Sequence, residues 1–523
     1  MEQVSSKTST LKAHAIAVLG TGSDVGKSLV VAGLCRLLRR AGMRVAPFKA
    51  QNMSNNSFVT PDGKEIGRAQ ALQAKACGLD PHADMNPILL KPESDRSAQI
   101  VVQGTVWGRF DARDYFTQKD ELASRVRESY DRLAGNYDVI IIEGAGSAAE
   151  INLRDRDLAN WFAAELADAC VVLVADIDRG GVFAQVIGTL DLLSPNERKR
   201  VIGVVINKFR GDITLFTDGV ALIEQRTGIP VLGVVPFLHG LGLDQEDSMN
   251  VDLDRQVQFE SDRVNIAVIL LPRMSNFTDF NHLAEEEDVA LRYVATPGDL
   301  VGADVVVIPG SKNTIGDLAY LQEAGFTGPL REHVAQKREL VGICGGYQML
   351  GRSIDDPHGV EAGGTAEGLG FLNVTTRLLN VKVTRQVEAA SVHLKDGTEA
   401  LVQGYFVHMG ETQRGDLSPC FRMCPADDGA RRQQASSEDS MDGASSADGM
   451  VWGTYIHGVF DRPDFRRMWL NRIRKRRGLH GLSVEQSERI TQRLNSELDR
   501  WTNHLETHMN FKLLIKVACS IIA

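Results

Sequence analysis

The sequence has no long hydrophobic run of the kind that targets a protein to a membrane or crosses one. Its first residues contain no apolar stretch long enough for the core of a signal peptide. The last apolar run, residues 511–523, carries two lysines and is shorter than the roughly 20 residues that a spanning helix needs. We therefore expect a cytoplasmic protein without a membrane partner.

Paired cysteines and an excess of basic residues are also missing. The seven cysteines are scattered singly, without a CxxC pair or the dense spacing of a secreted disulfide scaffold, so we expect a reducing compartment. The formal net charge of -10 gives no basic face for nucleic acid, and we expect no such partner. An anionic ligand would have to be held by local groups.

The length and the pattern of apolar residues predict an α/β fold with two α/β domains. A chain of 523 residues is too long for one core. Short β-branched runs alternate with helical patterns, which is typical of βαβ units around a mostly parallel sheet. Expected strands of the first half are residues 15–19, 45–48, 139–142, 170–175, 201–206 and 231–235, with helices at 28–41 and 67–77. Expected strands of the second half are residues 266–271, 305–308, 340–343 and 452–456.

These elements indicate a first domain over residues 14–240, a linker over 241–263 and a second domain over 264–475. Residues 426–449 are rich in Ser, Asp, Ala and Gly and cannot bury a core, so we expect a solvated insertion. Residues 476–523 are expected to form a helical tail. Its amphipathic stretch and the preceding RIRKRR run are interpreted as a solvated helix face.

A phosphate-binding loop follows the first strand. The segment GTGSDVGKS, residues 20–28, connects a strand to a helix and provides converging backbone N–H groups, a lysine and a hydroxyl for magnesium. Thr21 stands where the strict GxxxxGK[ST] motif has its first glycine, so the loop is a variant. We expect ATP and Mg²⁺ as cofactors. The predicted nucleotide-binding residues are Gly22, Gly26, Lys27 and Ser28, with Ser28 also contacting the metal.

Further polar residues stand at the ends of the expected strands, where open α/β sheets bind ligands. Glu143, in VIIIEGAGS, is predicted to bind the metal or substrate, although a solvated turn is the alternative. Asn207 is interpreted either as an adenine contact or as a helix N-cap. Asp176 and Asp178, which end a further expected strand, are weaker candidates for metal binding than Glu143.

The segment KAQNMSNNS, residues 49–57, is dense with amide side chains. Loops at this edge of a sheet carry function, and neutral hydrogen-bonding groups suit a substrate with many amides and carboxylates. A turn-rich surface loop is the alternative. The predicted substrate-binding residues are Gln51, Asn52 and Asn55.

The second half contains a nucleophile elbow. The strand ELVGI leads directly into Cys344, and two glycines then begin a helix, an arrangement that holds the sulfur exposed and favours a thiolate. A buried structural cysteine is the alternative. His457, just beyond a later strand, is the predicted base, with His408 as a competitor that we interpret as structural or substrate-facing. The oxyanion hole should combine the N–H of Gly345 with one from Gly310 or Ser311 in PGSKNT.

At these residues the chain resembles class I glutamine amidotransferases of the cobyric acid synthase family, from about residue 14 to about residue 475. The motifs follow that family's order: GTGSDVGKS, KAQNMSNNS, IEGAGS, NKFRGD, PRMSNFTDF, PGSKNT, GICGGYQMLG and TYIHGVFD. The first half alone looks like the dethiobiotin synthetase-type nucleotide-binding fold.

The resemblance implies a role in cobalamin biosynthesis. Carboxylates b, d, e and g of adenosylcobyrinic acid a,c-diamide would be amidated with ATP and ammonia from glutamine, which makes glutamine and a corrinoid the expected partners; an oligomer is compatible with this expectation. Cys344 would be the thioester-forming nucleophile and His457 its base. The third triad position, often a Glu two residues after the His, is Val459, and the Glu often found before the HMG motif is replaced by Phe406. The resemblance therefore names no group that orients the imidazole.

Three other functions remain open. The chain could act as a cobyrinic acid a,c-diamide synthase-type enzyme or as a cell-wall precursor amidotransferase, although the amide-rich loop at Gln51 argues against both. A different class is a switch ATPase of the partitioning type, because such proteins also use variant phosphate loops. Cys344 and His457 would then have no role, and a glutaminase assay would decide.

Overall fold

In the computed structural model, the first half of the chain is built on a parallel sheet. The structure describes residues 13–522 except residues 95, 244–257, 362, 393–398 and 425–439. The strands run in the order β12-β11-β10-β1-β9-β2, and every pair is parallel. Their bounds are β1 (His14–Gly20), β2 (Val45–Phe48), β9 (Val139–Glu143), β10 (Cys170–Asp176), β11 (Val201–Phe209) and β12 (Val231–Pro236).

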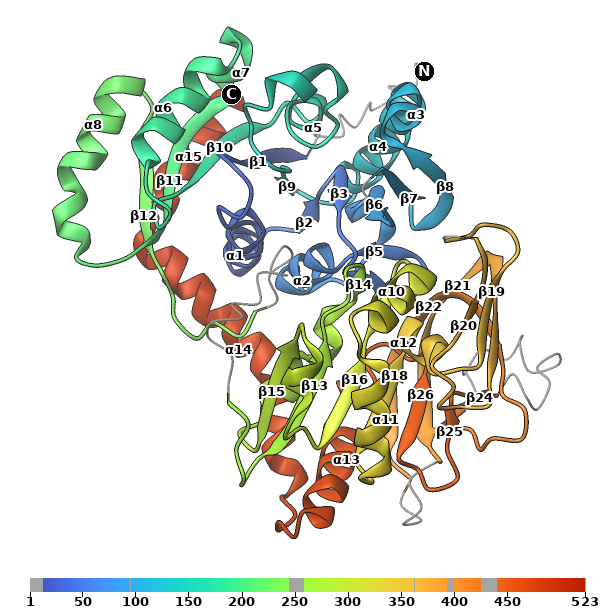
Figure 1. The fold of residues 1–523 in the computed structure, drawn as a ribbon. Helices are drawn as coiled ribbons and strands as arrows, with labels where there is room; N and C mark the ends of the chain where they lie inside the picture. The colour runs from blue at the N-terminus through green and yellow to red at the C-terminus, as the bar shows by residue number, and fades with distance from the viewer. Residues whose placement is uncertain are drawn as a thin grey trace, which may run out of the picture.

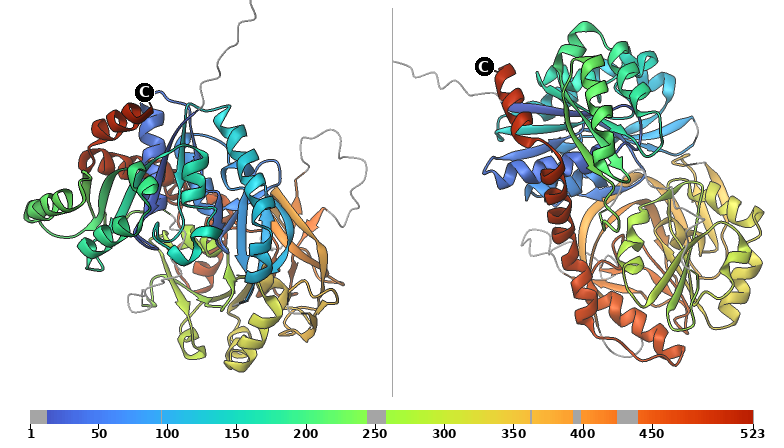
Figure 2. Two further views of the ribbon diagram at one scale, coloured as in Figure 1. Left: turned by 90° about the horizontal axis from the view of Figure 1, so that it is seen from above. Right: turned by 90° about the vertical axis from the view of Figure 1, so that its left-hand side faces the viewer.

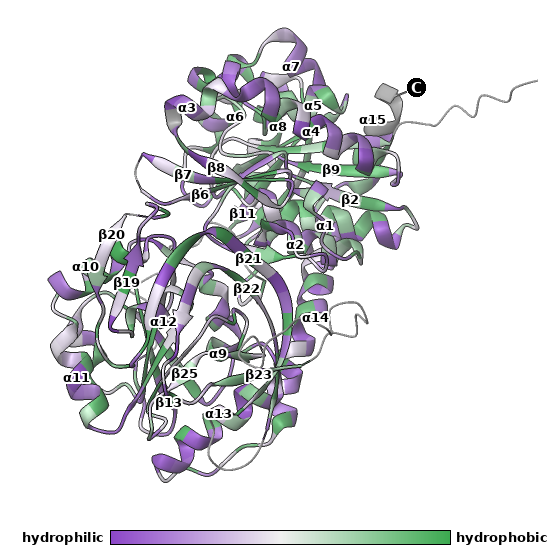
Figure 3. Cartoon of the chain, turned by 90° about the vertical axis from the view of Figure 1, so that its right-hand side faces the viewer, coloured by the Kyte–Doolittle hydropathy of each residue, from purple (hydrophilic) through white to green (hydrophobic). Residues whose placement is uncertain are grey.

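Helices pack on both faces of this sheet, which is why its strands are continuous apolar runs rather than alternating ones. Figure 3 shows the apolar strand β9 inside and polar residues on outer helices such as α3 and α7. The helices of this half are α1 (Lys27–Arg40), α2 (Arg68–Cys77), α3 (Ala112–Thr117), α4 (Lys119–Ala134), α5 (Trp161–Leu166), α6 (Val182–Leu192), α7 (Pro195–Arg200) and α8 (Thr217–Thr227).

A second, mostly antiparallel sheet follows β2, and the strand pattern did not predict it. It has the order β3-β6-β7-β8, with β3 (Gln51–Met53), β6 (Ile88–Pro92), β7 (Ser97–Val102) and β8 (Thr105–Asp111). The short hairpin of β4 (Ser57–Val59) and β5 (Glu65–Gly67) lies beside it. These strands occupy the side of the first lobe that faces the second lobe (Figure 1).

The second half is centred on another sheet, with the order β15-β13-β16-β18-β26-β25. Its strands are β13 (Val264–Ile269), β15 (Val289–Val294), β16 (Val305–Ile308), β18 (Glu339–Ile343), β25 (Ala444–Ser445) and β26 (Val451–Thr454), and only β25 is antiparallel to its neighbour. The helices are α9 (Asn281–Ala284), α10 (Thr314–Glu323), α11 (Thr327–Ala335), α12 (Gly345–Met349) and α13 (Pro463–Arg476).

A long hairpin dominates the outer sheet of this half. It is formed by β21 (Thr375–Ser391) and β22 (Leu401–Gln413), flanked by β19 (Ser353–Asp356), β20 (Gly364–Glu367), β23 (Phe421–Met423) and β24 (Met441–Asp442). A small ladder joins β14 (Met274–Ser275) to β17 (Gly310–Ser311).

The expected insertion at residues 426–449 needs correction. Residues 426–439 lie outside the described residues, but β24 and β25 belong to the folded sheets and Ala444 is fully buried. The Asp442 carboxylate accepts a hydrogen bond from the Thr454 hydroxyl. Composition suggested a solvated loop, but pairing with β23 and β26 buries this end of the segment. The expected linker also lies largely outside the described residues.

The C-terminal helices pack against both halves, whereas the RIRKRR run and the amphipathic stretch of the expected helical tail were interpreted as a solvated helix face. Helix α14 (Val484–His508) runs along both lobes, as Figure 2 shows, and α15 (Phe511–Ile522) follows it. Trp501 Nε1 donates a 2.6 Å hydrogen bond to the carbonyl of Leu29 in α1, and Leu505 is fully buried against Gly33 of the same helix. Arg472 and Arg476 of the RIRKRR run pair with the buried carboxylate of Glu339. Amphipathic pattern alone could not show that these faces have partners.

Replacing Leu505 with Ala is expected to lower the free energy of unfolding by about 2–5 kcal/mol, since it removes a fully buried side chain and leaves a cavity beside α1. Urea unfolding followed by circular dichroism would measure the loss. Replacing the neighbouring exposed Glu506 with Ala is the matched control and should change stability by less than about 0.5 kcal/mol. Equal effects of the two substitutions would contradict the packing described for α14.

No helix within the described part of the chain combines the length and the apolar character that crossing a bilayer requires.

Candidate functional site

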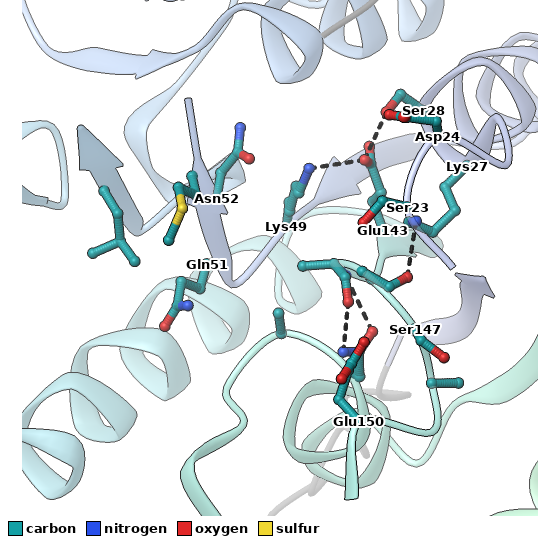
Figure 4. Close-up of a pocket in the computed structure, with 18 of the residues that line it drawn as sticks. Ser23, Asp24, Lys27, Ser28, Lys49, Gln51, Asn52, Glu143, Ser147 and Glu150 are labelled. Atoms are coloured by element: carbon teal, nitrogen blue, oxygen red, sulfur yellow. Dashed lines mark hydrogen bonds and ion pairs between the residues drawn. The ribbon is translucent and has the colours of Figure 1, made fainter. Parts of the chain in front are cut away.

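The phosphate loop connects β1 to α1 in the first half. Gly26 has a φ of 95°, and a Cβ at this position would collide with the side-chain amide of Asn207. Lys27 is largely buried and its Nζ donates to the carbonyls of Gly22 at 2.9 Å and Gly146 at 3.0 Å. The loop thus holds a fixed cation at its centre, as Figure 4 shows.

Glu143 is the centre of a buried polar cluster beside this loop (Figure 4). Its carboxylate accepts from the Ser28 hydroxyl at 2.7 Å, pairs with Lys49 Nζ at 2.9 Å and also accepts from the amide of Gln73. Burial by itself would raise the pKa of Glu143, but the Lys49 charge and these hydrogen bonds lower the pKa below its ordinary value. Glu143 is therefore a carboxylate at neutral pH.

Ser28 and Glu143 supply oxygen donors of the type that Mg²⁺ prefers. Magnesium in nucleotide sites binds through one or two protein oxygens together with phosphates and water. The hydroxyl and the carboxylate lie 2.7 Å apart at the base of the phosphate loop, so this donor set fits the ion. Among the described residues, no cluster of three or more His, Cys, Asp or Glu side chains suggests a different metal site.

A cavity of about 1140 Å³ opens beside the phosphate loop. Lys27, Ser28 and Glu143 line one end of it, and Gln51 and Asn52 line another part. Met53, Phe110 and Phe116 add an apolar portion to the wall. Such a mixture of apolar surface with a few directed polar groups is typical of a small-molecule site.

Several residues predicted for this site have other contacts. Asn55 is not among the residues that line the cavity; its amide donates to the Pro92 carbonyl at 3.2 Å. Asn207 lines the cavity, but its amide donates to the Val25 carbonyl at 2.9 Å and so supports the phosphate loop. Asp176 and Asp178 are paired with Lys208 and Arg210, respectively, and do not join the Glu143 cluster.

The elbow at Cys344 has the backbone strain expected of a nucleophile turn. Cys344 has φ 50° and ψ -106°, an uncommon conformation for a residue other than glycine, and its N–H is anchored to the Thr454 carbonyl at 2.8 Å. A Cβ on Gly346 would collide with the carbonyl of Ile308, which explains why a glycine follows the turn so closely. The turn directs the sulfur toward the segment after β26.

His457 lies in that segment and contacts Cys344. Its Nδ1 lies 2.7 Å from Oδ2 of Asp279, and Cys344 lies close enough to the imidazole to influence its charge. The second oxygen of Asp279 accepts from the N–H of Gly458 at 2.9 Å, which fixes the carboxylate. Burial alone lowers the pKa of His457, but the Asp279 charge and the Cys344 contact outweigh it and raise the pKa to about 10. The three side chains form a buried Cys–His–Asp chain.

The segment PGSKNT lies next to Cys344 and His457. A Cβ built on Gly310 would lie 3.1 Å from Cε1 of His457, and one built on Gly345 would lie 2.9 Å from the backbone N of Ser311. The backbone of residues 310–311 therefore lies beside the elbow, where the N–H groups of an oxyanion hole are needed.

His408 does not occupy the place of the base. Its Nδ1 lies 2.9 Å from the Gly410 carbonyl, and its ring stacks on Tyr455 with centroids 3.9 Å apart. Burial lowers the pKa of His408 to about 4, which keeps the imidazole neutral. Val459 is buried, and the group that orients His457 is instead Asp279.

Sequence reasoning missed Asp279 and Lys49. Asp279 lies in the quoted PRMSNFTDF motif, but 178 positions separate it from His457, and its partner could not be inferred. Lys49 directly follows β2, which pairs with β9, so the rule that ligands meet at the carboxyl ends of parallel strands could have placed it beside Glu143.

Two domain families match the chain, and curated relatives match it almost end to end. The CobQ/CobB/MinD/ParA nucleotide binding domain matches residues 16–251, and the CobB/CobQ-like glutamine amidotransferase domain matches residues 265–465. The cobyric acid synthase of Klebsiella pneumoniae (strain 342) is 48% identical over 94% of this chain and 96% of its own length. The chain belongs to the cobyric acid synthase family. The expected resemblance and the α/β fold class are thereby confirmed.

A more distant member agrees with this assignment. The cobyric acid synthase of Syntrophobacter fumaroxidans is 43% identical over 97% of this chain and 99% of its own length. The chain is thus a glutamine-dependent amidoligase with a nucleotide-binding domain. Among solved structures, PurLQS from Thermotoga maritima matches 45% of the chain and 99% of its own length, at 14% identity with a TM-score of 0.29.

Proposed function

We propose that this protein uses ATP to amidate carboxylates b, d, e and g of adenosylcobyrinic acid a,c-diamide, with ammonia released from glutamine. One observation carries the proposal: a single chain contains both the Cys344–His457 pair and a phosphate loop that opens onto a large cavity. The curated relatives are named cobyric acid synthases, which favours this activity over the a,c-diamide synthase, cell-wall and switch ATPase alternatives. We place the protein in the cytoplasm.

Glutamine hydrolysis begins at the elbow. The sulfur of Cys344 attacks the side-chain amide carbon of glutamine, and the electron pair of the C=O moves to oxygen. Backbone N–H groups of Gly345 and of Gly310 or Ser311 stabilise this oxyanion. His457 gives a proton to the leaving nitrogen, ammonia departs and a thioester remains. His457 then takes a proton from water as the water attacks the thioester, which releases glutamate and restores the sulfur.

The first half activates the acceptor. A carboxylate is a poor electrophile, and transfer of the terminal phosphoryl group of ATP to it gives an acyl phosphate that ammonia can attack, with phosphate leaving. Lys27 offsets the charge on the transferred group. Ser28 and Glu143 would hold Mg²⁺, which supplies further charge neutralisation when bound. Gly22, Gly26 and Asn207 shape the loop.

The cavity walls suit a corrinoid acceptor. Gln51 and Asn52 offer amides for its peripheral carboxylates and amides, and the apolar wall suits the macrocycle. Asn55 supports this wall from behind, through its bond to Pro92.

The direct test is to incubate the protein with the a,c-diamide, Mg-ATP and glutamine and to follow the corrinoid by mass spectrometry. We expect four successive small mass decreases, each from replacement of one hydroxyl by one amino group. Product that stops at another number of amides, or glutamine hydrolysis without any amidation, would contradict the proposal.

Replacing Asp279 with Asn is expected to reduce glutamine-dependent turnover by about 10²–10⁴-fold, because the amide no longer fixes the imidazole of His457. The Asp279 charge raises the pKa of His457, so the imidazolium persists up to a pH of about 10. Without that charge the pKa falls, and the alkaline limb of the pH–rate profile should move to lower pH. Asp288 is a partly buried acid that pairs with Arg467 and Arg474, and replacing it with Asn controls for the loss of a paired carboxylate. A profile unchanged in Asp279→Asn would refute the orienting role.

A further inference from the structure

The cavity of the first half extends to both sides of the phosphate loop. In the parallel sheet, β1 and the loop that follows it lie near the centre, β2 forms one edge and β12 forms the other. Gln51 and Asn52, which follow β2, line the cavity on one side, and Phe237 and Leu241, which follow β12, line it on the other. Lys27 lies between the two sides, so a ligand bound at Lys27 can extend toward either edge of the sheet.

The geometry of phosphoryl transfer decides which ligand extends to which side. The attacking oxygen of the acceptor and the leaving oxygen of the nucleotide stand roughly in line, on opposite sides of the transferred phosphoryl group. In the proposed function Gln51 and Asn52 lie on the acceptor side, so the leaving nucleoside diphosphate, with its ribose and base, extends toward β12. We call this side of the cavity the base end; it is lined by Phe237, Leu238, Leu241 and Trp501.

The base end is built from aromatic and aliphatic side chains that are held in place. Trp501 belongs to α14, and its Nε1 donates at 2.6 Å to the carbonyl of Leu29, in the first turn of α1 directly after Ser28. Phe237 is held by Arg210, whose guanidinium carbon lies 3.8 Å from the centre of the aromatic ring. A purine gains free energy when its faces leave water and contact such side chains. This surface therefore suits the base of a nucleotide.

Helix α14 also holds the backbone of the loop at residues 236–242, which carries the other side chains of the base end. Arg500 donates to two successive carbonyls of this loop, at 2.8 Å and 2.9 Å. His504 Nε2 lies 2.8 Å from the first carbonyl of the loop, and the Glu497 carboxylate accepts from its last N–H at 3.1 Å. These contacts reach from one end of the loop to the other, so α14 sets the position of the whole loop.

We propose that helix α14 is part of the nucleotide site, with Trp501 as a wall of the base end and Arg500 as the positioning residue of the loop at 236–242. Although α14 follows the second half in the sequence, it completes the site of the first half. It recognises the base and ribose of a purine nucleoside triphosphate, whereas Lys27 binds the phosphates. The identity of this ligand rests on the proposed function; the contacts of α14 do not.

Two substitutions in α14 test this role. Arg500→Met removes the hydrogen bonds to the loop and keeps the aliphatic part of the side chain, which is 42% exposed, so the fold should tolerate the change. Trp501→Leu removes the aromatic wall and the hydrogen bond to Leu29. Arg489→Met is the matched control, because Arg489 is an exposed arginine near the start of the same helix. Thermal unfolding of each variant checks that it is folded.

Calorimetric titration measures the binding of two magnesium-loaded ligands: AMP-PNP, a non-hydrolysable ATP analogue, and inorganic triphosphate, which has the phosphates without the ribose and base. Arg500→Met should weaken the binding of AMP-PNP about fivefold and Trp501→Leu about tenfold or more, while both variants bind triphosphate as the wild type does. Arg489→Met should bind both ligands normally. In amidation assays with ammonium chloride, KM for ATP should rise by similar factors with kcat little changed.

Equal weakening of AMP-PNP and triphosphate binding in the two variants would overturn the inference, since that result indicates a distorted phosphate loop and not the loss of a base contact. Normal AMP-PNP binding in both variants would also overturn it. The proposed function fails separately, if the wild type binds AMP-PNP but does not amidate the a,c-diamide even with ATP and ammonium chloride.

Discussion

Replacing Cys344 with Ala is expected to abolish glutamine-dependent amidation, by at least about 10³-fold, while amidation from added ammonium salts continues. The substitution removes the sulfur that forms the thioester, and the first half of the chain keeps its phosphate loop and its cavity. The measurement is the rate of corrinoid amidation with each nitrogen source in turn, alongside glutamate release.

The partly exposed Cys424 offers a matched control in the same half. Cys424→Ala should retain amidation from glutamine and from ammonium. This result would show that the effect of Cys344→Ala comes from removing the nucleophile and not from removing any thiol. If Cys344→Ala lost both routes while remaining folded, the division of labour between the two halves would be wrong. If it retained glutamine use, the sulfur would not be the nucleophile.

Replacing Lys27 with Ala is expected to reduce amidation from glutamine and from ammonium alike, by about 10²–10³-fold. Its ammonium group is fixed by the carbonyls of Gly22 and Gly146 at the point where the phosphates of the nucleotide are expected. Both nitrogen sources need the same phosphoryl transfer, and the charge of Lys27 stabilises the transferred group in that step. Parallel assays with the two nitrogen sources measure the effect.

Lys199, exposed on α7, provides the control for removing a lysine from this half. Lys199→Ala should keep full activity. Lys27→Ala should still hydrolyse glutamine slowly, because Cys344 and His457 are intact, and this residual activity shows that the protein is folded. Retention of ammonium-dependent amidation in Lys27→Ala would contradict the assignment of the phosphate loop.

Much of the fold could be predicted because its signals are local. The strands expected at residues 45–48 and 305–308 are found with those bounds, and the strands next to the phosphate loop and to Cys344 differ by one or two residues at their ends. A parallel strand covered on both faces must be apolar throughout, and glycines must follow where the chain turns sharply into a helix. Short stretches of sequence contain both signals.

Sequence alone predicted the strand, turn and helix around Lys27 and around Cys344, which we interpret as a phosphate loop and a nucleophile elbow, since the three elements of each motif are contiguous in the chain. Only the tertiary structure decided that Asp279 orients His457, that Lys49 meets Glu143, and that α14 packs on α1. Each of these contacts joins residues far apart in the sequence, and residue type restricts such partners without choosing among them. The choice is made when the sheets form and bring distant strand ends together.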